Sequence, residues 1–124
     1  NSVVRRRAVA FLVSDFMAED YEIALRIANR RHDMIAVVVR DPREEELPAV
    51  GLAHVRDAET GREVLVNTND PAVREAYAKA ARRRARERGE IFRRTGVDAM
   101  QTWTDRPYVD EIYRFFRMRE RRRR

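Results

Sequence analysis

The feature that most constrains this chain is an unbroken apolar run near its start, Ala8-Val9-Ala10-Phe11-Leu12-Val13. Alternating apolar and polar residues would predict a strand with one solvated face, whereas a continuous run predicts a strand covered on both faces, as in a parallel sheet between helices. The run is too short to span a bilayer. We therefore interpret it as an interior parallel strand. Its carboxyl end places Ser14 and Asp15 at the edge of the sheet where open α/β folds bind their ligands.

Length and composition limit what the chain can be. Its 124 residues suit a single domain, residues 1–124, with one hydrophobic core. The absence of cysteine excludes disulfides, thiol nucleophiles and thiolate metal sites, and it fits a cytoplasmic location. No apolar run approaches the roughly 18 residues of a membrane helix, and the start of the chain lacks the order of a secretory signal.

The net charge of +6 is carried almost wholly by arginine, and Lys79 is the only lysine. An arginine excess is typical of proteins that bind nucleic acid or an anionic membrane. It is also typical of ordinary solvated faces encoded by a GC-rich genome. Because glutamates alternate with the arginines through much of the chain, we favour the second interpretation.

Strands and helices are expected to alternate along the rest of the chain. A helix over about 21–31 has apolar residues at helical spacing, Ile23, Ala24, Ile27 and Ala28, which predict its buried face. The second apolar run, 34–39, predicts another interior strand, so that the two strands and the helix between them form a βαβ unit. Asp41-Pro42 ends this strand, and the acidic segment 44–48 is expected to be a loop.

The second half of the chain adds a hairpin and two helices. Two short strands around a loop at 57–61 predict an inserted β-hairpin over about 52–67. Asp70-Pro71 predicts the start of a basic helix over about 71–95, which ends at Gly96. Residues 97–103 predict an edge strand because polar positions interrupt them. A C-terminal helix over about 107–120 shows a stripe of Val109, Ile112, Tyr113 and Phe116, and the arginines at 121–124 are expected to fray. These elements predict an α/β fold with a three-stranded, mostly parallel sheet, flanking helices and the inserted hairpin.

The first strand raises a problem of sheet order. Successive strands usually lie side by side, which would leave this strand at an edge. Its residues argue against an edge, because both faces are apolar and no proline or charge protects it. Either the hairpin covers the edge, or the strand order is 2-1-3, or the chain is the second half of a larger sheet. We favour the last, which predicts a homodimer or strand exchange through the 8–13 edge in the isolated chain.

Several segments are similar to one known family. Val13-Ser14-Asp15-Phe16, residues 31–37, the run Asp41-Pro42-Arg43-Glu44-Glu45-Glu46-Leu47-Pro48, residues 104–109 and Phe115-Phe116-Arg117 resemble the carboxyl-terminal half of the domain-of-unknown-function-58 family. That family is related to von Willebrand factor type A domains, and its genes tend to lie beside those of MoxR-type AAA+ ATPases. The resemblance implies that this chain is the second half of a von Willebrand A-like, Rossmann-like domain.

The resemblance also implies a function for Asp15. It corresponds to the late aspartate of a metal-ion-dependent adhesion site, where an Asp-x-Ser-x-Ser loop, a threonine and this aspartate hold a divalent cation. No Asp-x-Ser-x-Ser sequence occurs in this chain. One carboxylate is too little for the octahedral oxygen shell of Mg²⁺, so Mg²⁺ or Ca²⁺ is expected only in the intact domain. Ser14 is a candidate to support Asp15 in that site.

Asp15, Asp41 and Asp105 each follow a predicted parallel strand, so all three are expected near the same edge of the sheet. Asp41 and Asp105 are candidates for contact with a partner, although Asp41 also suits a proline turn and Asp105 a helix N-cap. No Gly-x-Ser-x-Gly elbow or glycine-rich phosphate loop occurs. We therefore expect a non-enzymatic protein-interaction module, an adaptor or co-chaperone for a MoxR-type ATPase. The alternative is a basic nucleic-acid-binding domain, in which Trp103, Tyr108 and Tyr113 would stack on bases.

Overall fold

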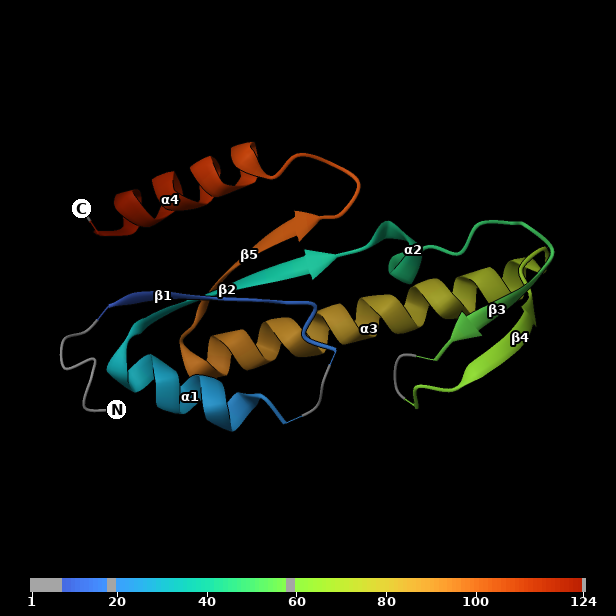
Figure 1. Ribbon diagram of the computed structural model, residues 1–124, viewed down its shortest axis with the longest axis horizontal. Coiled ribbons are helices and arrows are strands. Elements are labelled where there is room, and N and C mark those ends of the chain that lie inside the picture. The colour runs from blue at the N-terminus through green and yellow to red at the C-terminus, as the bar shows by residue number, and fades with distance from the viewer. Residues whose placement is uncertain (1–7, 18–19, 58–59, 124) are drawn as a thin grey trace. The chain divides into compact units, whose positions relative to one another are not determined.

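The computed structural model describes residues 8–17, 20–57 and 60–123. Its elements in chain order are β1 (Val9–Ser14), α1 (Glu22–Arg31), β2 (Asp33–Arg40), α2 (Pro42–Glu45), β3 (Leu52–Arg56), β4 (Glu63–Asn67), α3 (Pro71–Thr95), β5 (Asp98–Trp103) and α4 (Val109–Arg123) (Figure 1). The described residues divide into two compact units. We call residues up to 40 with those from 88 onward the sheet unit, and residues 41–87 the hairpin unit.

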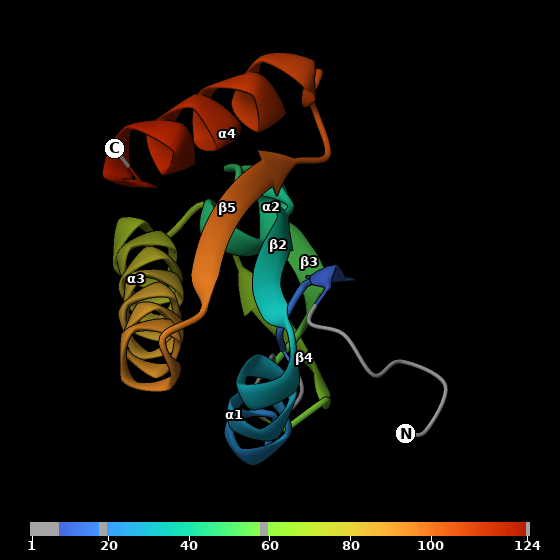
Figure 2. The same ribbon diagram turned by 90° about the vertical axis from the view of Figure 1, so that its left-hand side faces the viewer.

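The sheet unit is built on a parallel sheet in the order β1-β2-β5, so that β2 lies between the other two strands (Figure 2). β2 is the buried strand because both of its edges are paired. The sequence predicted this parallel sheet, and β5 lies at an edge as expected. β1 is also at an edge of this chain's sheet, so the order 2-1-3 is wrong. Among the described residues β3 and β4 pair only with each other, so the hairpin does not add a strand beside β1.

The two faces of the sheet carry separate hydrophobic clusters. Met34, Ala36 and Val38 alternate with Ile35 and Val37 along β2, so they point to opposite faces. The first face packs against α1 and the end of α3 through Phe16, Leu25, Phe92 and Val97. The second packs against α4 through Ile35, Met100 and Phe115. Figure 1 shows α4 on one side of the sheet and α1 on the other.

The helices on these faces bury residues that differ in part from those predicted. On α1, Ala28 packs against the core as expected and Leu25 is buried at 2% exposure, whereas Ile23 and Ile27 are 71% and 52% exposed. On α4, Ile112 packs against the core as expected and Phe115 is buried, whereas Val109 and Tyr113 are 67% and 62% exposed and Phe116 is 38% exposed. Each helix carries two apolar stripes, and periodicity alone does not tell which one meets the sheet. The α4 helix also continues to Arg123 instead of fraying from 121, while Arg124 lies outside the described residues.

The hairpin unit contains the predicted hairpin and the first part of α3. β3 and β4 are antiparallel, with His54 opposite Leu65; residues 58 and 59 of the loop lie outside the described residues. The acidic segment begins with one helical turn, α2, instead of a loop from the start, because Asp41 caps it and proline occupies its first position. Residue Asp70 likewise caps α3 by accepting a hydrogen bond from the Ala72 N–H at 2.9 Å.

Gly96 ends α3 as expected, at a φ of 72°. The Val97 N–H then donates to the Phe92 carbonyl at 3.0 Å, which closes the helix end. Within the described residues, no helix is both long enough and apolar enough to cross a bilayer.

Candidate functional site

The loop after β1 carries the first predicted site residues. Ser14 Oγ accepts a hydrogen bond from the Phe16 N–H, and Asp15 Oδ1 accepts one from the Met17 N–H, both at 3.0 Å. The φ of Phe16 is 55°, which is uncommon for a bulky residue. Its ring compensates by packing edge-on against Tyr21 and Phe92, with centroid distances of 5.2 Å to each. The buried phenylalanine therefore anchors the loop and leaves Asp15 exposed at the carboxyl end of β1.

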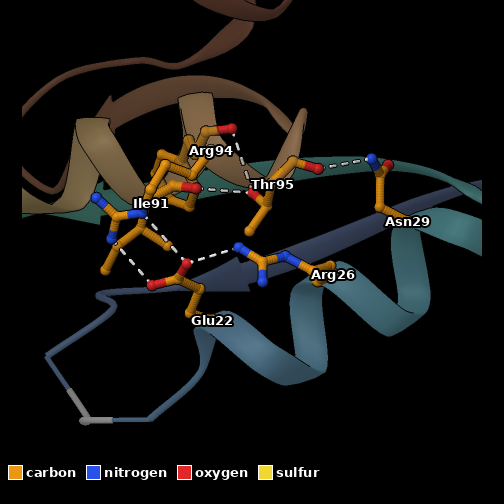
Figure 3. Close-up of polar contacts among 7 residues, drawn as sticks. Glu22, Arg26, Asn29, Ile91, Arg94 and Thr95 are labelled. Atoms are coloured by element: carbon orange, nitrogen blue, oxygen red, sulfur yellow. Dashed lines mark hydrogen bonds and ion pairs between the residues drawn. The ribbon is translucent and has the colours of Figure 1, made fainter.

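Polar contacts join α1, the helix that follows this loop, to the end of α3 (Figure 3). Glu22 accepts hydrogen bonds from Arg94 at 2.9 and 3.3 Å and from Arg26 at 2.9 Å. The bonds from Arg94 are the main reason that the pKa of Glu22 is lowered, and they raise that of Arg94. At the other end of α1, Asn29 donates to the Thr95 carbonyl at 3.0 Å. The helix that follows the Asp15 loop is thus tied to α3 at both ends.

The other two predicted aspartates have partners of their own. Asp105 is half exposed and pairs with Arg106 at 3.0 Å. Asp41 belongs to the hairpin unit, where its Oδ1 accepts from the Arg43 N–H at 3.0 Å as the cap of α2. Because β2 separates the strands that precede Asp15 and Asp105, these loops begin two strand spacings apart, about 10 Å.

Across the part of the chain that the structure describes, no group of three or more His, Cys, Asp or Glu side chains is placed to hold a metal ion. The residues present therefore do not make a complete adhesion-type cation site. Ligation of an ion by Asp15, with support from Ser14, stays a prediction for the intact domain.

A cluster that the sequence analysis missed lies at the carboxyl ends of β2 and β5. Arg40 and Trp103 end these strands and lie opposite each other. The guanidinium carbon of Arg40 is 4.5 Å from the centroid of the Trp103 ring, and that of Arg106 is 4.9 Å away. Arg40 also donates a hydrogen bond to Gln101. We call Arg40, Gln101, Trp103 and Arg106 the arginine–tryptophan cluster.

Sequence reasoning considered Trp103 only as a base-stacking residue. The signal in the sequence that could have pointed to this cluster is an arginine and a tryptophan at the ends of two predicted strands. Their contact depends on which strands pair and in what register, which the sequence alone left open.

An ion-pair network lies at the opposite, amino-terminal end of the same strands. Arg119 of α4 pairs with Asp33 and, at 3.1 Å, with Asp98. Arg122 also pairs with Asp98, at 2.6 Å. The Arg119 side chain is only 10% exposed, so this network fixes α4 on the sheet. It is far from the end at which α/β sheets bind ligands.

The exposed side of β1 forms an apolar surface together with α4. Phe11 packs against Phe116 with a centroid distance of 6.0 Å. Beside them, Val9, Tyr113 and Phe116 line an open groove with Arg117, Arg119 and Glu120. We call Val9, Phe11, Val13, Tyr113 and Phe116 the β1–α4 surface.

The arginines of α3, the basic helix of the nucleic-acid alternative, lie among carboxylates. Arg82 pairs with Glu75 at 3.0 Å and Arg83 with Glu87 at 4.0 Å, and all four side chains are more than half exposed. Tyr113, one of the proposed stacking residues, is contacted by Arg117, whose guanidinium donates to the tyrosine hydroxyl at 3.2 Å. Alternating charges of this kind are typical of a solvated helix face.

Comparison with known proteins places the chain among relatives whose own descriptions name no activity. The chain is 37% identical over 120 residues to uncharacterized proteins of Mycobacterium tuberculosis (Rv1480) and Mycobacterium bovis (Mb1516), and the match covers 94% of this chain and 37% of each relative. It is 35% identical over 120 residues to an uncharacterized protein of Mycobacterium avium, covering 94% of this chain and 69% of that relative. The chain thus spans little more than a third of the length of the first two. No solved structure matches it. Residues 1–87 match the model of the family described as "Protein of unknown function DUF58", and the chain belongs to that family.

Proposed function

We propose that this chain is a protein-interaction module rather than an enzyme. It would form part of a larger von Willebrand A-like α/β domain, an adaptor or co-chaperone for a MoxR-type AAA+ ATPase. The observation that carries the proposal is the edge of the sheet at β1, which no other strand of the described residues covers and where Val9, Phe11 and Val13 are 53%, 51% and 62% exposed. Contiguous apolar surface of this kind marks an interaction site in a folded protein.

The chemistry of β1 favours the addition of another strand. Its sequence, Val9–Ser14, contains no proline and no charged residue, which are the features that normally protect an edge from pairing. One side of its backbone pairs with β2. A further strand along the other side would satisfy the remaining backbone groups and cover the apolar side chains.

The occupant that we propose is a strand from the remainder of a longer family polypeptide. Two observations support this choice. The mycobacterial relatives extend well beyond the matched segment, which is 37% of their length. The second apolar stripes of α1 and α4, with Ile23 at 71% and Tyr113 at 62% exposure, suit helices packed beside the added strand. A second copy of this chain would pair with the same edge only when that strand is absent.

The test is the oligomeric state of the isolated chain, because an uncovered edge should pair with itself. We expect light scattering over a concentration series to show reversible dimers. Val13→Lys should shift the equilibrium to monomers, since it places a charge on the edge. Val64→Lys in β4, where the valine is 45% exposed, is the matched control and should leave the dimer unchanged. A monomer at all concentrations, with slow hydrogen exchange on both sides of β1, would overturn the edge proposal.

The ATPase partner rests on the family resemblance and is tested separately. The longest available polypeptide that contains this chain is immobilised, and purified MoxR-type ATPase from the same genome is passed over it with ATP present. We expect saturable binding that Val13→Lys does not abolish when the strand partner is already in place. Absence of binding to this polypeptide would overturn the ATPase partnership and leave the strand-addition proposal standing.

A further inference from the structure

The positive charge of this chain lies in the sheet unit. That unit holds 18 of the 27 basic residues and 11 of the 21 acidic ones, whereas the hairpin unit holds nine basic and ten acidic residues. The net charge of +6 therefore comes from the sheet unit alone. Alternation of arginine with glutamate explains the charges on the first part of α3, but it does not explain this excess.

Within the sheet unit the excess lies at one end, where the three helices finish and the strands begin. Figure 1 shows α1, α3 and α4 all ending toward the left of the view. Asn29 of α1 donates to the Thr95 carbonyl of α3 at 3.0 Å, and Arg122 of α4 pairs with Asp98, the first residue of β5, at 2.6 Å. We call the last seven residues of α1, α3 and α4, with the first residues of β2 and β5, the basic end.

The basic end contains ten arginines and four carboxylates. Two of these carboxylates, Asp33 and Asp98, pair with Arg119. Arginine in the last turn of a helix complements the helix dipole, but each helix end carries only about half a negative charge, so three ends offset a small part of the excess. Within the residues that the structure describes, four exposed arginines of the basic end have no partner for their guanidinium groups, namely Arg30, Arg31, Arg93 and Arg121. These four charges are available to a ligand.

The arrangement of the charges suits a flat anionic surface. α1 and the end of α3 cover one face of the sheet and α4 covers the other, so the arginines spread over the whole end of the unit rather than along one groove. The opposite end carries more acidic than basic residues, with Asp15, Asp20, Glu22, Asp105, Asp110 and Glu111 against Arg40, Arg106 and Arg114. A unit polarised in this way is oriented by a negative plane, with its basic end toward that plane.

Nucleic acid suits the basic end less well. Proteins that bind single strands combine a basic groove with aromatic residues that stack on the bases. Trp103 is the last residue of β5 and Tyr108 directly precedes α4, so both lie at the opposite end of the sheet. Anionic lipid headgroups need no stacking partner, and each arginine near such a surface adds to the binding.

From these observations we propose that the basic end rests on the phosphate headgroups of an anionic membrane. Its four unpaired arginines would lie closest to the headgroups, and the carboxyl ends of the strands, with Asp15, would face away from the lipid. A strand added beside β1 extends the sheet sideways and leaves this end uncovered. The proposal therefore does not depend on the function proposed above.

Sedimentation with lipid vesicles tests the proposal directly. The full chain is mixed with vesicles of equal parts phosphatidylcholine and phosphatidylglycerol, and in parallel with vesicles of phosphatidylcholine alone. We expect saturable binding to the anionic vesicles that weakens as salt is added, and no binding to the neutral ones. Each arginine at the surface should strengthen the binding about fivefold.

Arginine variants locate the contact. Arg121→Gln should weaken binding to the anionic vesicles about fivefold, and the double variant Arg30→Gln, Arg31→Gln about 25-fold. Arg114→Gln is the matched control on the same helix, at a side chain that is 71% exposed. Arg114 lies about 10 Å before Arg121 along α4, which is about one Debye length further from the lipid, so its loss should weaken binding less than about twofold. Circular dichroism confirms that each variant is folded.

Trp103 reports on the orientation of the bound chain. It is the only tryptophan, and it lies about 17 Å along β5 from the basic end. Brominated phosphatidylcholine in the anionic vesicles should therefore leave its emission unquenched while the chain is bound. Quenching of Trp103 would show that the opposite end meets the lipid and would overturn the proposal.

Three further results would overturn it. They are equal binding to the neutral vesicles, absence of saturable binding to the anionic ones, and an equal loss in Arg114→Gln and Arg121→Gln. Tighter binding of single-stranded oligothymidylate or of polyglutamate than of the anionic vesicles would also overturn it, in favour of a nucleic acid or an acidic protein. Val13→Lys should still bind the anionic vesicles, so failure here and failure of the β1 proposal are distinguishable.

Discussion

Replacing Arg119 by methionine should destabilise the sheet unit by removing the cation that joins α4 to two strands. Arg119 pairs with Asp33 at the start of β2 and with Asp98 at the start of β5. Methionine keeps most of the side-chain volume and the contact with Phe115, whose ring centroid is 5.9 Å from the guanidinium carbon. The substitution therefore tests the charge of Arg119 more than its packing.

The structure sets the size of the effect. Breaking a fully buried ion pair by removing one partner costs about 3–5 kcal/mol, because the other charge stays buried without compensation. Here Asp33 and Asp98 are 22% and 27% exposed, so water reaches them, and Arg122 still pairs with Asp98. We therefore expect the free energy of unfolding to fall by about 2–3 kcal/mol, at the lower end of that range or below it.

Urea unfolding followed by circular dichroism measures this loss. With a slope of about 1.5 kcal/mol per molar urea, the midpoint should move down by about 1.3–2 M. Arg121→Ala, an exposed arginine on the same helix, is the control and should lie within about 0.5 kcal/mol of the parent chain. The triple variant Arg119→Met, Asp33→Asn, Asp98→Asn should regain much of the stability, because no unpaired carboxylate remains.

Either of two outcomes would refute this reasoning. If Arg119→Met were as stable as the Arg121→Ala control, the network would contribute nothing to the attachment of α4. If the triple variant were less stable than Arg119→Met alone, unpaired charge would not be the cause of the loss.

Three further predictions concern the packing of α1 and the end of α3. Leu25→Ala should lower the free energy of unfolding in urea by about 2–4 kcal/mol, because the side chain is 2% exposed. Ile27→Ala, at 52% exposure, should lower it by less than about 1 kcal/mol. Equal losses of stability in the two variants would contradict the observed burial. Glu22 has a folded pKa below its ordinary value of 4.5. Its contribution to stability should therefore be present above pH 4.5 and disappear as the pH falls through the folded pKa. If the difference in unfolding free energy between the parent chain and Glu22→Gln did not close in acid, this sign would be contradicted. Gly96→Ala should lower the melting temperature by about 4 °C, because alanine at a φ of 72° costs about 1 kcal/mol. The added Cβ would meet the Asn29 side chain at 3.5 Å, an ordinary contact distance, so the backbone conformation is the source of the cost. An unchanged melting temperature would show that the backbone relaxes there.

The local elements of this protein follow from short-range signals. A continuous apolar run predicted each of the two strands β1 and β2, and the pair Asp70-Pro71 with Gly96 predicted the bounds of α3, Pro71–Thr95. These predictions succeed because capping, proline geometry and left-handed glycine act within a few residues of one another.

The buried faces of the helices could not be predicted in the same way. α1 offers Leu25 on one stripe and Ile23 with Ile27 on another, and both stripes fit a helical period. The structure buries Leu25 because the cluster around Phe16 and Phe92 lies on that side. Which stripe is covered depends on elements distant in sequence, so it is a property of the packing.

The candidate sites show the same division. The sequence alone determined that Asp15 follows an apolar strand and lies at the carboxyl end of the sheet, because a parallel strand delivers its next residues there. Only the tertiary structure decided that β1 is an edge strand, that Asp15 and Asp105 are separated by β2, and that Arg40 and Arg106 meet at Trp103. The physical reason is that strand order and register join residues some sixty positions apart, and no short-range pattern encodes which of these partners meet.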